Sequence, residues 1–238
     1  MTETLTDANA NAMGRPLRRK EDARLLHGQT NWTDNIQLPG MLHMAILRSP
    51  MAHARITNLD VSAALKRPHV VAAFTAKDLG DLNGSIPCVW PVTDDIQMPA
   101  FPALAIDKVR HVGDCVAVVL ATDKYAAADA LDAIEVDYEP LPAVIDMEAA
   151  IQRGSTAVHE AADGSHGTNV CYEFPLKPQG DGAFEAAVKA AGDDAVVVKR
   201  RFINQRIIAG YMEPRAVVAS PMGMSNEMTI WSATQIPH

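Results

Sequence analysis

A strand–helix–strand pattern is predicted near the middle of the chain. An uninterrupted apolar run, Val116–Leu120 (VAVVL), has the length and composition of a buried strand. The alanine-rich stretch Lys124–Ala133 follows it and favours a helix, for which Thr122 or Asp123 can serve as N-cap. Ile134–Tyr138 then alternates apolar and polar residues, which is typical of a half-buried strand. This pattern predicts an α/β fold.

Other local patterns predict the remaining elements of the first half. A helical turn is expected near Glu21–Leu26, and a second within Ser62–Arg67, where a proline follows. Strands are expected at Leu42–Arg48 and Val70–Phe74, because both runs are rich in apolar residues.

The last part of the chain contains one amphipathic helix. Phe184, Val188 and Ala191 are spaced i, i+4 and i+7, so they share one face. Asp181 is a suitable N-cap for this helix, and Gly192 is a suitable stop. Three strands are expected after it, at Ala195–Ile203, Arg215–Ala219 and Glu227–Ala233.

Composition and charge exclude several classes of protein. Hydrophobic residues make up 48% of the 238 residues, enough to bury a core. The formal net charge of −8 argues against binding to nucleic acid, whose phosphates require clustered lysine and arginine. No stretch has the length and apolarity of a membrane span, and the first residues do not resemble a secretion signal. We therefore expect a cytoplasmic protein without a membrane span.

Motifs for metals and common cofactors are absent from the sequence. Cys88, Cys115 and Cys171 are too widely spaced for a disulfide framework or an iron–sulfur motif, and no histidine pair has ligand spacing, so no metal-ligating residue is predicted. GxGxxG, GxxxxGK[ST], HExxH and GxSxG are also missing. Residue patterns alone therefore predict a globular α/β protein without a defined activity.

Four segments, in order along the chain, carry a family resemblance. The first is Gly14–Leu42, which ends in LPGML, and the second is Arg48–Ile56 (RSPMAHARI). The third is Val136–Pro142 (VDYEPLP). The fourth combines Tyr211–Arg215 (YMEPR) with Trp231–His238 (WSATQIPH). Together they resemble the N-terminal portion of molybdenum-hydroxylase large subunits, the family of xanthine dehydrogenase, aldehyde oxidase and aerobic carbon monoxide dehydrogenase.

The resemblance implies a specific α/β (α+β) architecture. An aldehyde oxidase/xanthine dehydrogenase-type α/β hammerhead domain is followed by the first strands and helix of the molybdenum-cofactor-binding domain. The expected divisions are an N-terminal tail and lead-in at residues 1–27, the hammerhead domain at 28–142, a linker at 143–168, and the incomplete start of the molybdopterin-binding domain at 169–238.

The resemblance also implies a function within a complex. Such a complex hydroxylates a carbon of an aldehyde or an N-heteroaromatic compound, or oxidises carbon monoxide, with water as the oxygen source. The implied cofactor is molybdenum-molybdopterin, in its cytosine dinucleotide form. The implied partners are a small-molecule substrate, the C-terminal part of the large subunit, an iron–sulfur small subunit and an FAD-binding medium subunit, to which the electrons pass.

Gln235 is the residue that the resemblance assigns to catalysis and to cofactor binding. In the family, the glutamine of the TQ element donates a hydrogen bond to an oxo ligand of molybdenum. A neutral amide donor stabilises negative charge as it develops there. Glu213 is expected in a turn or in an ion pair with Arg215, because the family's general base lies far downstream. Arg48 and His53 are expected to serve the architecture.

Two alternatives to a catalytic part stay open. The family's Gly-rich loop, its pterin-binding loops and its base glutamate are not found in this sequence, so we expect the isolated chain to be inactive. A non-catalytic docking module that binds the iron–sulfur subunit, or a truncated fragment, accounts for the same segments. The presence of Gln235 favours the catalytic interpretation, although a recently truncated protein would also retain this residue.

Overall fold

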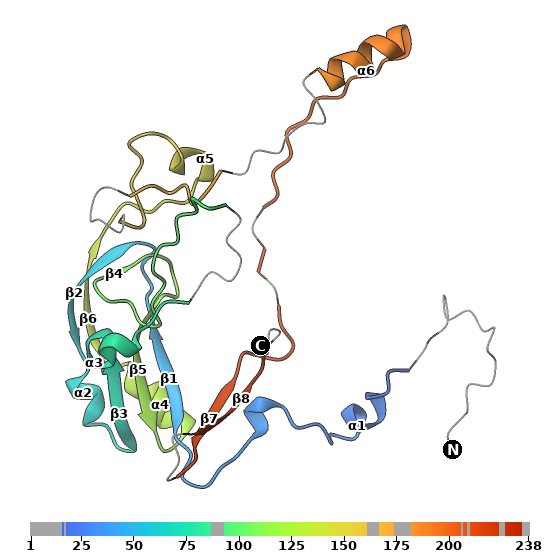
Figure 1. Ribbon diagram of the computed structural model, residues 1–238. Coiled ribbons are helices and arrows are strands. Elements are labelled where there is room, and N and C mark those ends of the chain that lie inside the picture. The colour runs from blue at the N-terminus through green and yellow to red at the C-terminus, as the bar shows by residue number, and fades with distance from the viewer. Residues whose placement is uncertain are drawn as a thin grey trace. The chain divides into compact units, whose positions relative to one another are not determined.

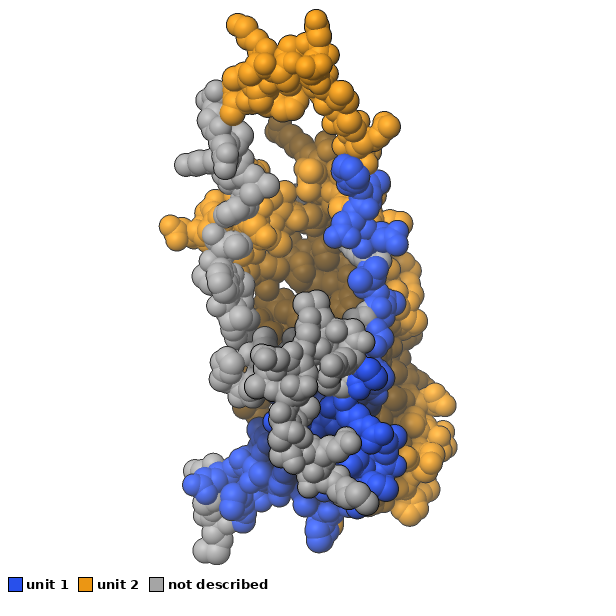
Figure 2. All heavy atoms as spheres, turned by 90° about the vertical axis from the view of Figure 1, so that its right-hand side faces the viewer, with its two compact units in different colours: residues 1–39, 202–238 blue, residues 40–201 orange. Residues whose placement is uncertain are grey.

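A computed structural model describes most of the chain, namely residues 16, 18–86, 93–160, 167–173, 182–205, 207–208, 210–223 and 227–234. The chain divides into two compact units, which Figure 2 colours separately. Unit 1 comprises residues 1–39 and 202–238, and unit 2 comprises residues 40–201. Each unit is described by itself.

Two three-stranded antiparallel sheets form the framework of unit 2 (Figure 1). In the first sheet, β5 (Cys115–Ala121) lies between β1 (His43–Arg48) and β3 (Val70–Thr75). In the second sheet, β2 (Ala54–Asp60) lies between β4 (Lys108–Val109) and β6 (Glu135–Pro140). The predicted strands β5 and β6 therefore belong to different sheets, and β2 was not among the predicted strands.

Alanine-rich helices cover the first sheet. The helix α4 (Lys124–Leu131) contacts β1 and β5, and α2 (Ser62–Leu65) contacts β3 and α4. The Asp123 carboxylate accepts hydrogen bonds from two N–H groups of the first turn of α4, at 3.0 and 2.9 Å, and so caps the helix. The fully buried Val119 packs between Ala64 and Ala130 of the two helices. Small side chains let these helices approach the sheet closely.

Five shorter or more exposed elements are also found among the described residues of unit 2. They are α3 (Ala76–Leu79), η2 (Gly80–Leu82), α5 (Met147–Ala150) and the helix α6 (Ala183–Ala191) with its following turn η3 (Gly192–Asp194). Gly182 is the N-cap of α6, with φ of 82°, whereas the predicted cap Asp181 lies outside the described residues. The strand predicted at Ala195–Ile203 does not form.

Unit 1 is built around one β-hairpin. The strands β7 (Val217–Pro221) and β8 (Met228–Ser232) pair in antiparallel fashion, as their sequences predict. The N-terminal part contributes α1 (Asp22–Leu26) and the 3-10 turn η1 (Thr33–Asn35), which packs against β7. None of the helices in the described part of the chain has the length and apolarity needed to span a membrane.

Candidate functional site

The β7–β8 hairpin brings two motif segments to one end. Val217 pairs with Ser232 at the open end of the hairpin, and the Ala233 N–H donates to the Ala216 carbonyl at 3.0 Å. The YMEPR segment therefore leads into β7 where the TQ segment leaves β8. Gln235 follows this end directly in the sequence but lies outside the described residues.

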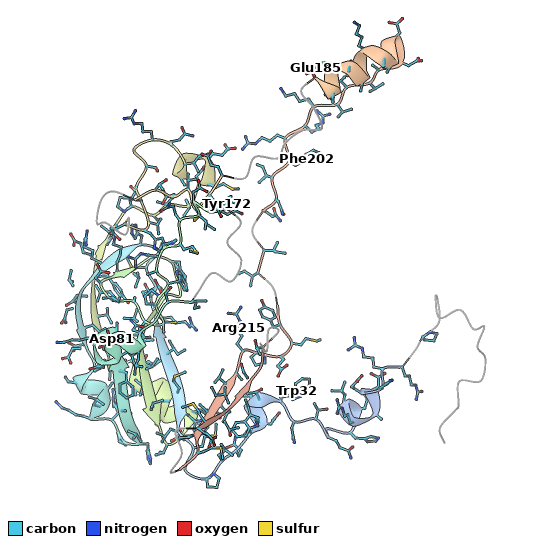
Figure 3. All side chains as sticks on the ribbon, viewed as in Figure 1. Trp32, Asp81, Tyr172, Glu185, Phe202 and Arg215 are labelled. Atoms are coloured by element: carbon cyan, nitrogen blue, oxygen red, sulfur yellow. The ribbon has the colours of Figure 1, made fainter. Side chains whose placement is uncertain are left out.

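The described side chains at this end make a cation–π contact. The guanidinium carbon of Arg215, a residue labelled in Figure 3, lies 5.7 Å from the centre of the Tyr211 ring. Glu213 is exposed, and within the described ranges no ion pair joins it to Arg215. Of the two roles expected for Glu213, the described structure thus has the turn, since Glu213 lies in a bend, while Arg215 stacks on an aromatic ring, a contact of about 0.5–1 kcal/mol at exposed positions.

The RSPMAHARI and VDYEPLP segments pair with each other in unit 2. Ala54 lies opposite Pro140 in the β2–β6 ladder, and the Leu141 N–H donates to the His53 carbonyl at 2.9 Å. His53 Nδ1 lies 2.8 Å from the Pro142 carbonyl oxygen. Because a carbonyl can only accept, Nδ1 carries the proton and donates. The two motifs are thus neighbours in the fold, joined by strand pairing and by these hydrogen bonds.

Arg48 has the architectural role that the sequence suggests. Its Nη1 donates to the Gly113 carbonyl at 2.9 Å and to Cys115 Sγ at 3.3 Å. The backbone of the buried Ser49 also bonds to this loop, with the Ser49 N–H donating to the Asp114 carbonyl and the Gly113 N–H donating to the Ser49 carbonyl, both at 2.8 Å. These bonds tie the turn after β1 to the turn before β5.

A charged cluster fastens the segment before residue 161 to β4. Lys108, only 3% exposed, forms an ion pair with Glu160. Arg110 donates from Nε to the Val158 carbonyl at 3.2 Å and from Nη2 to Glu160 at 3.4 Å. We call Lys108, Arg110 and Glu160 the linker clasp. No local sequence pattern predicted it, because its members are about 50 positions apart.

The clasp also perturbs ionisation. The hydrogen bond from Lys108 lowers the pKa of the Glu160 carboxyl to about 2, although desolvation opposes this shift. Burial lowers the pKa of the neighbouring His159, and the positive charge of Arg110 adds to the effect. At neutral pH, Glu160 is therefore charged and His159 neutral.

Asn169 holds the same segment from a second side. Its Oδ1 accepts from the Val158 N–H at 3.0 Å, and its Nδ2 donates to the carbonyls of Thr156 and Ala150 at 2.9 and 3.1 Å. A single partly buried amide thus bonds to the last residue of α5 and to two backbone groups of the segment that follows, which fixes the path of the chain after α5.

Comparisons with known proteins give the family. Residues 27–142 match the domain family described as aldehyde oxidase and xanthine dehydrogenase, a/b hammerhead domain, and residues 163–238 match the molybdopterin cofactor-binding domain. The chain belongs to the aldehyde oxidase and xanthine dehydrogenase family. Members of this family are known as oxidoreductases, and the hammerhead domain is the part represented here by the two sheets of unit 2.

Individual relatives resemble the chain along almost its whole length. The carbon monoxide dehydrogenase large chain of Afipia carboxidovorans is 36% identical over 95% of this chain, and the nicotine 6-hydroxylase large subunit of Paenarthrobacter nicotinovorans is 32% identical over 96%. The structure of quinoline 2-oxidoreductase from Pseudomonas putida 86 matches 93% of this chain with 35% identity and a TM-score of 0.76.

The chain spans about a quarter of the length of these relatives. It covers 28% of the carbon monoxide dehydrogenase large chain, 26% of the nicotine 6-hydroxylase large subunit and 27% of the quinoline 2-oxidoreductase chain.

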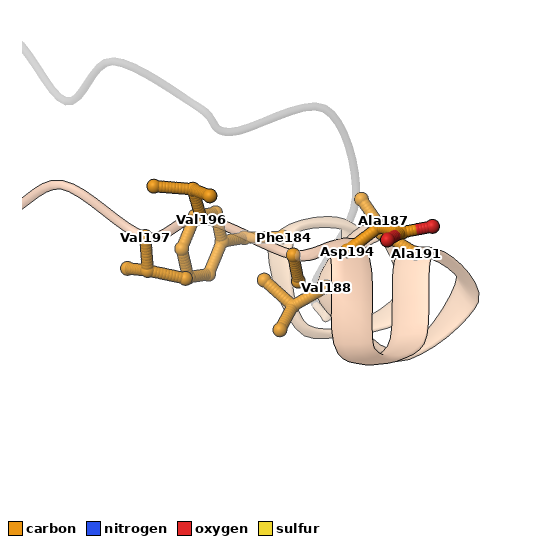
Figure 4. A pocket seen from close by; sticks show the side chains of 8 residues that line it. Phe184, Ala187, Val188, Ala191, Asp194, Val196 and Val197 are labelled. Atoms are coloured by element: carbon orange, nitrogen blue, oxygen red, sulfur yellow. The ribbon is translucent and has the colours of Figure 1, made fainter.

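The described residues do not by themselves fit a molybdenum cofactor. Within the described ranges, no three histidine, cysteine, aspartate or glutamate side chains are grouped as metal ligands. The groove beside α6 is lined by alanine, valine and phenylalanine, with Asp194 as its one charged residue, and so lacks the donors that a phosphate-bearing pterin requires (Figure 4).

Proposed function

We propose that this chain is part of the molybdenum-binding catalytic subunit of a multi-subunit oxidoreductase. The observation that carries the proposal is the order of the two matched domains, a hammerhead domain at residues 27–142 and a molybdopterin cofactor-binding domain at 163–238. The meeting of the YMEPR and TQ segments at one end of the β7–β8 hairpin supports it. We further propose the domain divisions of residues 28–142 and 169–238.

In this proposal, Gln235 is the residue of this chain that contacts the cofactor. The molybdenum cofactor, when bound, supplies two-electron redox chemistry. A glutamine amide is a neutral donor, so it stabilises negative charge that develops during the reaction without adding a competing full charge. The match of residues 163–238, which include Gln235, to the molybdopterin cofactor-binding domain supports this role.

The names of the relatives support the proposed substrate class. They include a carbon monoxide dehydrogenase, a nicotine 6-hydroxylase and a quinoline 2-oxidoreductase. We propose that the complex hydroxylates an aldehyde or N-heteroaromatic carbon, or oxidises carbon monoxide, with oxygen from water. Electrons then pass to iron–sulfur and FAD subunits, the cofactor carries a cytosine dinucleotide, and the complex is cytoplasmic.

A docking module without cofactor is the second candidate. One observation favours it, namely that unit 2, which contains the strands of the hammerhead match, buries its own core around Val109, Val116 and Val119. Such a module would bind the iron–sulfur subunit through the hammerhead domain and would have no use for the Gln235 amide.

One experiment distinguishes the catalytic part from the docking module. The chain is purified from its own host, its metal and pterin contents are measured, and the co-purifying proteins are identified. Molybdenum and pterin in a stable complex with a C-terminal large-subunit polypeptide, together with slower turnover in Gln235→Ala, are the results expected for the catalytic part. Stoichiometric association with an iron–sulfur protein, without molybdenum or pterin, would refute the catalytic proposal and support the docking module.

A further inference from the structure

The sequence contains one asparagine that is followed by glycine, at Asn83–Gly84. This dipeptide comes directly after η2, whose Asp81 is labelled in Figure 3. Glycine has no side chain to hinder its backbone nitrogen, so this nitrogen can approach the amide carbon of the preceding asparagine. Gly84 is exposed, and its N–H donates no hydrogen bond to the described residues. The dipeptide therefore has the groups needed for attack of the Gly84 nitrogen on the Asn83 side chain.

Two hydrogen bonds hold the Asn83 side chain to the backbone of Leu104. Oδ1 accepts from the Leu104 N–H, and Nδ2 donates to the Leu104 carbonyl, both at 2.9 Å. Leu104 is only 3% exposed, and the N–H of the neighbouring Ala105 donates to the Cys115 carbonyl of β5 at 2.7 Å. This pair of bonds, here called the Asn83 tether, fastens residues 83–86 to a buried part of the chain beside β5.

We propose that Asn83–Gly84 is a site of spontaneous deamidation, and that the Asn83 tether controls its rate. Hydroxide removes the proton from the Gly84 nitrogen, which forms a bond to Asn83 Cγ. The bond from Cγ to Nδ2 breaks, and Nδ2 leaves as ammonia after it takes up protons from water. Water then opens the five-membered imide at one of its two carbonyls, which gives aspartate or isoaspartate. The reaction consumes one water molecule and changes no oxidation state.

The tether restrains the atom that must move. Oδ1 and Nδ2 are both bonded to Leu104, so Cγ cannot turn toward the Gly84 nitrogen until both bonds open. The open state is a minority in the folded chain, because opening gives up two hydrogen bonds at once. We therefore expect deamidation to be roughly tenfold or more slower in the folded chain than in the unfolded chain.

Deamidation also makes the opening permanent. The carboxylate formed from Asn83 can still accept from the Leu104 N–H, but it has no N–H for the Leu104 carbonyl and places a charged oxygen beside it. The next backbone bond, from the Ile86 N–H to the Phe101 carbonyl at 3.2 Å, joins residues that are 70% and 47% exposed, where water competes for it. The modification thus releases residues 83–86 from the buried part of the chain.

Incubation of the full chain at mildly alkaline pH, both folded and in urea, tests the proposal. Mass spectrometry of proteolytic peptides measures conversion at each asparagine, and enzymatic methylation detects isoaspartate. In urea, Asn83 should convert faster than Asn35, which is followed by the branched Ile36. In the folded chain, conversion of Asn83 should be roughly tenfold or more slower than in urea. These measurements need no cofactor and no partner, so their outcome is independent of the proposed function.

Two variants separate the reaction from its consequence. Gly84→Ala should slow conversion in urea several-fold and leave exchange of the Leu104 amide unchanged, because Gly84 has no positive φ and has open space for a Cβ. Asn83→Asp should speed exchange of the Leu104 amide about tenfold. Asn35→Asp is the matched control, since Asn35 is exposed in η1 and makes no side-chain hydrogen bond among the described residues. The β5 amides report correct folding in every variant.

Three results would overturn the proposal. Conversion of Asn83 in urea that is no faster than that of Asn35 would remove the site. Equal rates of conversion at Asn83 in the folded chain and in urea would remove the control by the tether. Unchanged exchange of the Leu104 amide in Asn83→Asp, with protected β5 amides, would show that the carboxylate does not release residues 83–86.

Discussion

Replacing Asn169 by alanine should release the segment between α5 and residue 160 without unfolding the sheets of unit 2. The Asn169 side chain bonds to the Val158 N–H and to the carbonyls of Ala150 and Thr156, at 2.9–3.1 Å. Ala150 is the last residue of α5, whereas Thr156 and Val158 lie in the following segment, which has no regular secondary structure. Loss of Asn169 therefore removes the side-chain partner of the Val158 N–H and of the Thr156 carbonyl, whereas the Ala150 carbonyl still accepts from Ser155 Oγ at 2.6 Å.

The magnitude follows from the three bonds. Each contributes about 0.5–1.5 kcal/mol net, so together they contribute about 2–4 kcal/mol to closing the segment. A local opening equilibrium shifted by this amount raises amide exchange roughly 30- to 1000-fold. The Val158 amide should show the full effect, because its acceptor is removed. The β5 amides should change little, because opening is confined to the loop.

Hydrogen–deuterium exchange with peptide-level mass spectrometry measures this effect. Asn169→Asp is a sharper variant, because it keeps an acceptor for Val158 but replaces two N–H donors with a carboxylate facing carbonyl oxygens. It should open the segment at least as much as alanine does. Asn58→Ala is the matched control, since Asn58 is exposed in β2 and makes no side-chain hydrogen bond among the described residues. Equal exchange of residues 150–160 in Asn169→Ala and Asn58→Ala would refute the reasoning.

Three further predictions follow from other parts of the structure. The contribution of Glu160 to stability is complete above its free pKa of 4.5 and declines as the pH falls toward its folded pKa of about 2. In Glu160→Gln, the free energy of unfolding measured by urea denaturation should therefore fall less steeply between pH 4.5 and pH 2. The same steepness in the variant and the parent chain would contradict the role given to the linker clasp. The folded pKa of His159 lies below 6.5, so below pH 6.5 the unfolded chain binds a proton at His159 more readily than the folded chain does, and stability declines. His159→Asn should remove this part of the pH dependence of the free energy of unfolding. In the loaded complex, Gln235→Ala should lower kcat by roughly 100- to 1000-fold while Gln205→Ala leaves it unchanged, and equal steady-state rates would exclude the proposed role.

Local chemistry made much of unit 2 predictable. Five apolar residues at Val116–Leu120 correspond to β5, and the alanine-rich stretch after them corresponds to α4. Asp123 caps that helix, as one of the two residues considered for this position. The strands β1 and β3 also fall where they are predicted. In each case, a few neighbouring residues determine the structure, so a single sequence contains the necessary information.

Long-range pairing was not predictable in the same way. β5, α4 and β6 follow one another in sequence, yet β6 pairs with β2. The strand β2 begins at Ala54, which is 81 residues before Glu135, the first residue of β6. The buried Lys108 looks like an ordinary lysine in sequence, because its partner Glu160 lies 52 positions away. The segment at 195–201 has strand composition, but a strand forms only when a partner satisfies its backbone. The assignment of Gln235 to catalysis and cofactor binding rests on the family resemblance, and this role stays a prediction.

The four family segments gain a physical explanation when they are considered as two pairs. RSPMAHARI and VDYEPLP are far apart in the sequence, but they meet in the β2–β6 ladder, where His53 donates to Pro142 and accepts from Leu141. YMEPR and the TQ segment meet at one end of β7–β8. A substitution at His53 therefore acts on both segments of the first pair. His53→Ala removes the donor to the Pro142 carbonyl, so its effect and that of a change at Pro142 should be non-additive, whereas changes at His53 and Arg215 should add, because they lie in different pairs.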